Sequence, residues 1–297
     1  MFYQVMTESA MNQLSLFDIE AYLSRGMDYD DKGKHKKAID EFNKALELNP
    51  NCAKAYNSRG LAYMHLKQYK KAVHDFRRAI NLRSEYHKAH NNIAVCYYHM
   101  NELPRAIYFY SCALKLKPDY VKAYQGRGIS YNEMGEYGKA LNDFNKAIGL
   151  SPDNAELYYD CGNIFMAMKK YEKAIANYDI AISMKPDFIK AYNNRGVCYR
   201  EMSLYHRAIA DFTLTILKKE GHEAGYGNLG KCYEKMQQYK KAEICYQIAV
   251  YIEQSDVFMK DALYCVRQKI KDGQAISWKH IENCSGVLLC GEIYSKS

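Results

Sequence analysis

Small and aromatic residues recur along most of this chain in one pattern with a period of 34 residues. When the units are numbered from position 1, position 8 is Gly or Ala, position 20 is Ala, and positions 4, 11 and 24 are aromatic, with the exception of His90. Positions 4, 8 and 11 share one face of a helix, and positions 20, 24 and 27 share one face of a second helix. The pattern therefore predicts a row of two-helix hairpins. The seven units begin at Ile19, Ala53, His87, Val121, Ala155, Ile189 and Glu223.

The small residues at positions 8 and 20 explain how the two helices of a hairpin can pack. They let the two backbones approach closely, and the rings at positions 4, 11 and 24 fill the space around the crossing. Glycine at position 8 would destabilise an isolated helix, so its repeated use indicates that close packing requires it. Proline at position 32 ends the second helix in four units, because it lacks an N–H and fixes φ. These residues are Pro50, Pro118, Pro152 and Pro186.

This arrangement of aromatic, small and proline positions resembles the tetratricopeptide repeat (TPR) family over residues 19–254. The resemblance implies an all-α fold, a right-handed α-solenoid of seven helix-turn-helix units with a concave groove. It also implies a class of function, because members of the family mostly bind other proteins, often as extended peptides. We therefore expect a non-catalytic scaffold or adaptor that binds a partner protein or peptide in this groove.

The same register predicts how the chain is divided. Each unit of a solenoid packs only on its neighbours, so we expect one elongated domain. Residues 1–18 precede it as an extension or cap, residues 255–272 form a capping helix that Ser255 or Asp256 begins, and residues 273–297 are a tail. The repeats are predicted at 19–52, 53–86, 87–120, 121–154, 155–188, 189–222 and 223–254.

Charge and cysteine content indicate which ligands and which cellular compartment to expect for the protein. The net charge of +8 comes without a long basic block, so we expect no direct contact with nucleic acid. The ten cysteines have no C-x-x-C spacing, and Cys96, Cys198 and Cys232 share position 10 as small core residues. We expect reduced thiols, no metal and no cofactor. No apolar run reaches membrane-spanning length and the N-terminus does not resemble a secretory leader, which favours a cytoplasmic protein without membrane contact.

The groove of such a fold is the expected binding surface. In the family the first helix of each unit lines it, with positions 2, 5, 6, 9, 12 and 13 pointing inward. Here position 2 is lysine in four units, and positions 5 and 6 often carry amides, which suits an extended acidic peptide. Positive charge is most one-sided in units two to four, our first choice for the site. The candidate peptide-binding residues are Lys54, Asn57, Lys88, Asn91, Asn92, Lys122, Gln125, Lys190, Asn193 and Asn194.

No group of titratable residues forms a catalytic motif, since the histidines are dispersed at outer, packing or turn positions. We therefore expect no enzyme. Two alternatives to an adaptor stay open: a regulatory subunit of a separate enzyme, and a sliding-clamp accessory in replication or repair. The second rests on Gln13–Phe17, which resembles the motif that docks into the bacterial clamp. We favour instead the interpretation that Leu14, Leu16 and Phe17 pack on the first unit as an N-terminal cap.

Overall fold

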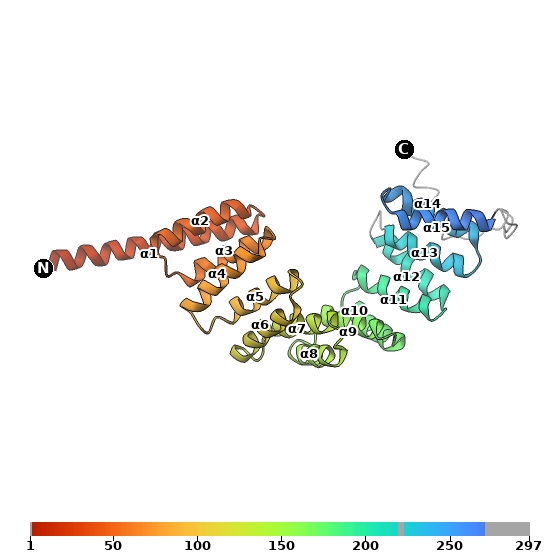
Figure 1. Cartoon of the computed structure of the whole chain (residues 1–297), viewed down its shortest axis with the longest axis horizontal. Helices are drawn as coiled ribbons and strands as arrows, with labels where there is room; N and C mark the ends of the chain where they lie inside the picture. Colours follow the sequence, from red (N-terminus) through yellow and green to blue (C-terminus); the bar gives the residue numbers. More distant parts are fainter. Residues whose placement is uncertain (1, 219–222, 271–297) are drawn as a thin grey trace. The chain divides into compact units, whose positions relative to one another are not determined.

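The computed structural model describes residues 2–218 and 223–270, with side chains for residues 17–218 and 224–270. This part of the chain forms fifteen α-helices and no strand (Figure 1). It divides into two compact units, an N-terminal unit of residues 1–152 and a C-terminal unit of residues 153–297, where the sequence predicts one elongated domain. An array in which each repeat packs only on its neighbours can divide in this way between two repeats.

The N-terminal unit contains four helical hairpins (Figure 1). Its helices are α1 (Phe2–Asp31), α2 (His35–Leu48), α3 (Ala53–His65), α4 (Tyr69–Leu82), α5 (His87–His99), α6 (Leu103–Leu116), α7 (Val121–Glu133) and α8 (Tyr137–Leu150). The C-terminal unit contains three hairpins and a final helix. Its helices are α9 (Ala155–Ala167), α10 (Tyr171–Met184), α11 (Ile189–Glu201), α12 (Tyr205–Lys218), α13 (Glu223–Lys235), α14 (Tyr239–Ile252) and α15 (Val257–Lys269).

Six of the seven predicted repeat starts coincide with the first residue of a helix. The exception is the first repeat, where α1 begins at Phe2 and runs through the predicted start at Ile19. The expectation that Phe17 packs on this repeat is wrong, because its side chain is 76% exposed. Ile19, Leu23 and Gly26 form the packed face of α1, and Phe17 lies two residues before Ile19, on the opposite side of the helix. The side chains of Gln13–Leu16 lie outside the described residues.

Close approach of the two helices explains the glycines at position 8. A Cβ atom added to Gly60 would lie 2.7 Å from Cε1 of Phe76, and one added to Gly162 would lie 2.5 Å from Cε1 of Tyr178. The alanines at position 20 are fully buried in all seven repeats. In the six repeats with glycine at position 8, the ring at position 24 therefore packs against its bare backbone, as the sequence predicts.

The turn within each hairpin uses a left-handed residue at position 15. In two repeats it is glycine, Gly33 and Gly135, with φ of 72° and 74°. In the other five it is a residue with a side chain at φ between 57° and 61°, a conformation that favours glycine. These residues are Lys67, Asn101, Lys169, Ser203 and Gln237.

First helices lie close together within each unit. Besides its hairpin partner, each first helix contacts the first helix of the next repeat, as in α1–α3, α3–α5 and α5–α7 of the N-terminal unit and α9–α11 and α11–α13 of the C-terminal unit. No pair of second helices packs in this way to a comparable extent among the described residues. The first helices thus form a continuous wall in each unit, called the first-helix wall below.

Helix α15 covers the last hairpin by packing on α14. Asp256 is its N-cap and accepts a hydrogen bond from the backbone N–H of Met259 at 3.1 Å, one of the two caps expected. Met259, Leu263 and Val266 are buried against the array. The predicted tail, residues 273–297, lies outside the described residues. None of the described helices is both long and apolar enough to cross a membrane.

Candidate peptide-binding site

Lysines of the N-terminal unit form a row along its first-helix wall. Lys54, Lys88 and Lys122 stand at position 2 of α3, α5 and α7, and all three are exposed. The Nζ of Lys54 lies 3.5 Å from Oε2 of Glu20 on α1. Lys88 and Lys122 form no ion pair with another residue that the structure describes. Lys190 holds the same exposed position on α11 of the C-terminal unit.

The amides of the N-terminal unit lie deeper than the sequence predicts. The sequence places Asn57 and Asn91 on the open groove, but both side chains are buried, on first helices that contact each other. Nδ2 of Asn92 in repeat three donates to Oδ1 of Asn57 in repeat two at 3.3 Å. Gln125 is half-buried. A role for these amides in binding peptide backbone stays a prediction, and one of their observed roles is to join repeats.

Amides of the C-terminal unit form a hydrogen-bonded ladder between first helices. Asn228 donates to Oδ1 of Asn193 at 3.0 Å, and Asn193 donates to Oδ1 of Asn194 at 3.2 Å. Asn194 in turn donates to Oδ1 of Asn163 at 2.8 Å and to the hydroxyl of Tyr159 at 3.1 Å. The ladder occupies donors that were expected to face a peptide, and it fixes the spacing of α9, α11 and α13.

Sequence reasoning missed an arginine that ties consecutive repeats together. Nε and Nη2 of Arg59 donate to the two carboxylate oxygens of Asp75 at 2.7 and 2.8 Å, while Nη1 reaches Asn43 of the preceding repeat at 2.7 Å. The bond to Asp75 raises the pKa of the Arg59 guanidinium. Arg127 and Arg195 make the same three-way contact in their repeats.

A signal for this contact is present in the sequence. Arginine at position 7 occurs with Asp or Glu at position 23, 16 residues later, in repeats one, two, four and six. The other three repeats have neither the arginine nor the carboxylate. Their residues at these positions are Ile93 and Phe109, Cys161 and Asn177, and Leu229 and Cys245. An arginine that occurs only in repeats that also have the carboxylate predicts an ion pair between the two. The carboxylates at position 23 are buried, so their role is structural.

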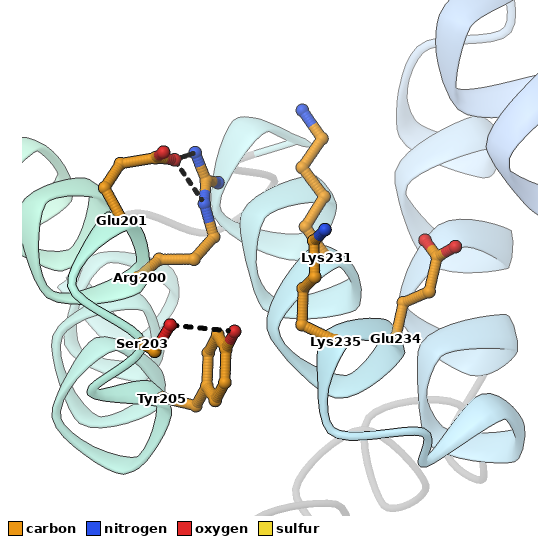
Figure 2. A pocket seen from close by; sticks show the side chains of 7 residues that line it. All are labelled: Arg200, Glu201, Ser203, Tyr205, Lys231, Glu234 and Lys235. Carbon is orange, nitrogen blue, oxygen red and sulfur yellow. Dashed lines mark hydrogen bonds and ion pairs between the residues drawn. The ribbon is translucent and has the colours of Figure 1, made fainter.

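A pocket of about 400 Å³ opens in the C-terminal unit between repeats six and seven (Figure 2). It lies where position 12 and position 17 of one repeat meet position 13 of the next, a place that we call a corner. Here these residues are Arg200, Tyr205 and Lys235. Figure 2 shows Arg200 and the lysines facing the pocket from α11 and α13. The complete lining is Arg200, Glu201, Ser203, Tyr205, Lys231, Glu234 and Lys235.

Both carboxylates of this pocket are already engaged. Glu201 accepts from Nη2 of Arg200 at 3.0 Å, and Glu234 accepts from Nζ of Lys269 at 2.7 Å and from the hydroxyl of Tyr246 at 2.9 Å. Neither lysine of the pocket forms an ion pair with a carboxylate among the described residues, and Arg200, Lys231 and Lys235 outnumber the two glutamates of the lining.

Lys231 is the lysine whose environment is most unusual. Its side chain is half-buried, and burial lowers the pKa of its ammonium group. The Nζ lies 4.8 Å from the centre of the Phe258 ring, a cation–π contact. Lys235 is exposed beside it. Asp256, Glu201 and Glu234 partly oppose this lowering, but none of them forms an ion pair with Lys231. A partly desolvated ammonium without an ion-pair partner is a group that an acidic ligand would stabilise.

Comparison with known families agrees with this architecture. A profile described as TPR repeat and two described as tetratricopeptide repeat together match most of the chain, so the chain belongs to the tetratricopeptide repeat family. This fold is typically a non-catalytic scaffold for protein interactions. The matched residues are 26–67, 128–169 and 162–203 for the first profile and 53–86, 87–120 and 224–256 for the others.

Solved structures with the same architecture confirm the all-α solenoid class. A tetratricopeptide repeat protein from Parabacteroides merdae is 19% identical with a TM-score of 0.66, over 84% of this chain and 99% of that chain. The Cut9–Hcn1 assembly of the APC/C gives 16% identity and a TM-score of 0.66, over 82% of this chain and 48% of that chain. YrrB is 26% identical with a TM-score of 0.52, over 65% of this chain and 97% of its own. No curated protein matches the chain.

Proposed function

We propose that this protein is a cytoplasmic adaptor that binds an extended, acidic segment of a partner protein on its first-helix wall. In the C-terminal unit the pocket between repeats six and seven holds a carboxylate of that segment. In the N-terminal unit the row of Lys54, Lys88 and Lys122 supplies the same sign of charge. The observation that carries the proposal is Lys231, a half-buried cation with no carboxylate partner among the described residues.

The chemistry follows from that cation. A ligand carboxylate within hydrogen-bonding distance of Lys231 would form a charge-assisted bond and restore the electrostatic stabilisation that burial removes. Lys235 and Arg200 add charge at the rim of the same pocket. Because exposed charges are screened by salt, affinity for the acidic segment is expected to fall as ionic strength rises.

A solved relative supports the choice of ligand class. YrrB, similar to this chain over 65% of its length, is described as a TPR protein with an unusual peptide-binding site. Free thiols are the form that a reducing cytoplasm maintains. Burial raises the pKa of Cys96 and of Cys198 to about 12, which keeps both thiols protonated.

The test is binding of a fluorescein-labelled library of acidic peptides to the full chain, followed by fluorescence anisotropy. Lys231→Gln with Lys235→Gln should weaken binding about tenfold or more, as expected for losing a hydrogen bond to a charged group. Lys146→Glu with Lys170→Glu is the control, because both residues are exposed and lie outside the pocket and the lysine row. Equal affinity of the pocket variant and the control would refute the pocket.

A second variant tests the N-terminal unit separately. Reversing Lys54, Lys88 and Lys122 to Glu leaves the packing residues untouched and should weaken binding of the same library. If neither this variant nor the pocket variant binds more weakly than the control, the acidic-peptide proposal fails as a whole.

The exposure of Phe17 favours one other candidate. Phe17 ends the segment Gln13–Phe17, and its side chain is 76% exposed, so it is available for the clamp-docking role considered above. Phe17→Ala should then abolish capture of a purified bacterial sliding clamp without altering acidic-peptide binding. Absence of capture by the unaltered chain would remove this candidate.

A further inference from the structure

A carboxylate and two imidazoles meet at the corner between repeats one and two. Asp30 lies in the last turn of α1, His35 is the first residue of α2, and His65 is the last residue of α3. Nδ1 of His35 lies 2.6 Å from Oδ1 of Asp30, and Nδ1 of His65 lies 3.1 Å from Oδ2 of the same carboxylate. One potential ligand atom from each residue lies within 4.8 Å of the other two.

The equivalent corner of the next repeat shows what this cluster replaces. There Tyr69 and His99 stack with ring centres 5.2 Å apart and an angle of 11°, and position 12 is Met64. Position 17 is tyrosine in five of the seven repeats, whereas repeat one has His35. Repeat one thus departs from the packing pattern at a residue that brings a second imidazole to the carboxylate.

We propose that Asp30, His35 and His65 bind one divalent transition-metal ion of the Zn²⁺ class. Zn²⁺ takes imidazole nitrogen and carboxylate oxygen at about 2.0–2.2 Å, so neighbouring ligand atoms of a tetrahedral site lie about 3.3–3.5 Å apart. Measured from Oδ1 of Asp30 alone, the two Nδ1 atoms lie at 2.6 and 3.3 Å, and the three ligand atoms all lie within 4.8 Å of one another, so rotation of these side chains can bring them to the ion. The charge also fits, because the dication meets one carboxylate and two imidazoles that bind it in neutral form.

The site has three protein ligands and one open position. The side chains of Asp30 and His35 are 13% and 23% exposed, whereas that of His65 is 44% exposed, so the cluster opens to solvent on the side of α3. Water or a donor from a bound partner would complete a four-coordinate ion. Since the ligands come from two repeats, the ion would also tie repeat one to repeat two and stabilise the folded state by linkage.

The test uses the full chain, treated with chelator and then titrated with Zn²⁺. We expect one bound Zn²⁺ that is lost in His35→Tyr and in His65→Ala, together with a rise in Tm on adding Zn²⁺ that both variants lose. His35→Tyr restores the residue that five other repeats carry at position 17, so it should fold. Affinity should fall by more than the roughly 10- to 100-fold that loss of an outer-shell partner costs, because each histidine is a direct ligand.

His99→Ala is the matched control, because His99 occupies the same position in the corner without a carboxylate. Titration with Co²⁺ distinguishes nitrogen and oxygen ligation from binding to the cysteines, through the charge-transfer band that thiolate ligands give. If His35→Tyr binds as much Zn²⁺ as the unaltered chain, or if the unaltered chain shows no Zn²⁺-dependent rise in Tm, the proposal is overturned.

Discussion

The arginine that links consecutive repeats allows a direct test of what stabilises the array. Arg127 donates to both oxygens of Asp143 at 2.7 and 2.8 Å, and the carboxyl side chain is only 2% exposed. Arg127→Leu would leave that buried carboxylate without a counter-charge, which costs about 3–5 kcal/mol in the free energy of unfolding. Adding Asp143→Cys reproduces the Leu229 and Cys245 pair of repeat seven and removes both charges. The double variant should therefore lie within about 1 kcal/mol of the unaltered chain.

Urea unfolding of the full chain, followed by far-UV circular dichroism, measures these differences. Only variants whose m-value, the slope of the unfolding free energy against urea concentration, is unchanged should be compared, because repeat arrays can lose cooperativity. Ser111→Ala serves as the control, since it removes the bond from Nη1 of Arg127 and the hydroxyl's own bond to the Ile107 carbonyl but leaves the ion pair with Asp143 intact, and it should cost about 1 kcal/mol. A double variant as unstable as Arg127→Leu alone would refute the argument, because it would show that burial of an unpaired charge is not what sets the cost.

Three further predictions follow from single positions. Lys169→Gly should raise stability by about 0.5–1 kcal/mol in urea unfolding, because Lys169 has φ of 57°, and an unchanged midpoint would contradict this. Gly60→Ala should lower Tm and cost about 1–3 kcal/mol, because its Cβ would lie 2.7 Å from the buried Phe76 ring; a neutral effect would show that the ring can move. The hydrogen bond from Lys44 lowers the pKa of Glu41 below its ordinary value of 4.5. The charged carboxylate of Glu41 therefore stabilises the folded state fully above pH 4.5, and this stabilisation is lost as pH falls through the lowered pKa. Glu41→Gln should therefore show a smaller loss of stability between neutral and acid pH, and equal acid sensitivity of both proteins would contradict the assignment.

The repeat register could be predicted because it depends on contacts within one hairpin. Gly60 and Phe76 recur at fixed positions, so a single aligned column reveals each partner. The ion pair of Arg59 with Asp75 left an equally regular signal, and it appears only when two columns are compared across the seven repeats.

The candidate sites were harder to predict, because they depend on contacts between repeats. Asn57 was expected to face a peptide, but a residue 35 positions away, Asn92, bonds to it across the wall. Asp30 and His65 are likewise 35 residues apart, and the periodicity of either helix alone does not show that they meet. The half-buried state of Lys231 depends on how α13 packs, which a pattern of hydrophobic positions does not determine.

The corners have a consequence for how such a protein can acquire new specificity. Positions 12, 13 and 17 lie outside the glycine, alanine and ring columns that define the repeat, so their chemistry differs from one repeat to the next, although Met64 and Tyr69 also pack on the core. The chain already displays three versions, a histidine–aspartate cluster, a ring stack and a basic pocket. Grafting the basic version onto the ring-stacked corner would require Met64→Arg, Val95→Lys and His99→Lys as counterparts of Arg200, Lys231 and Lys235, since Tyr69 already matches Tyr205.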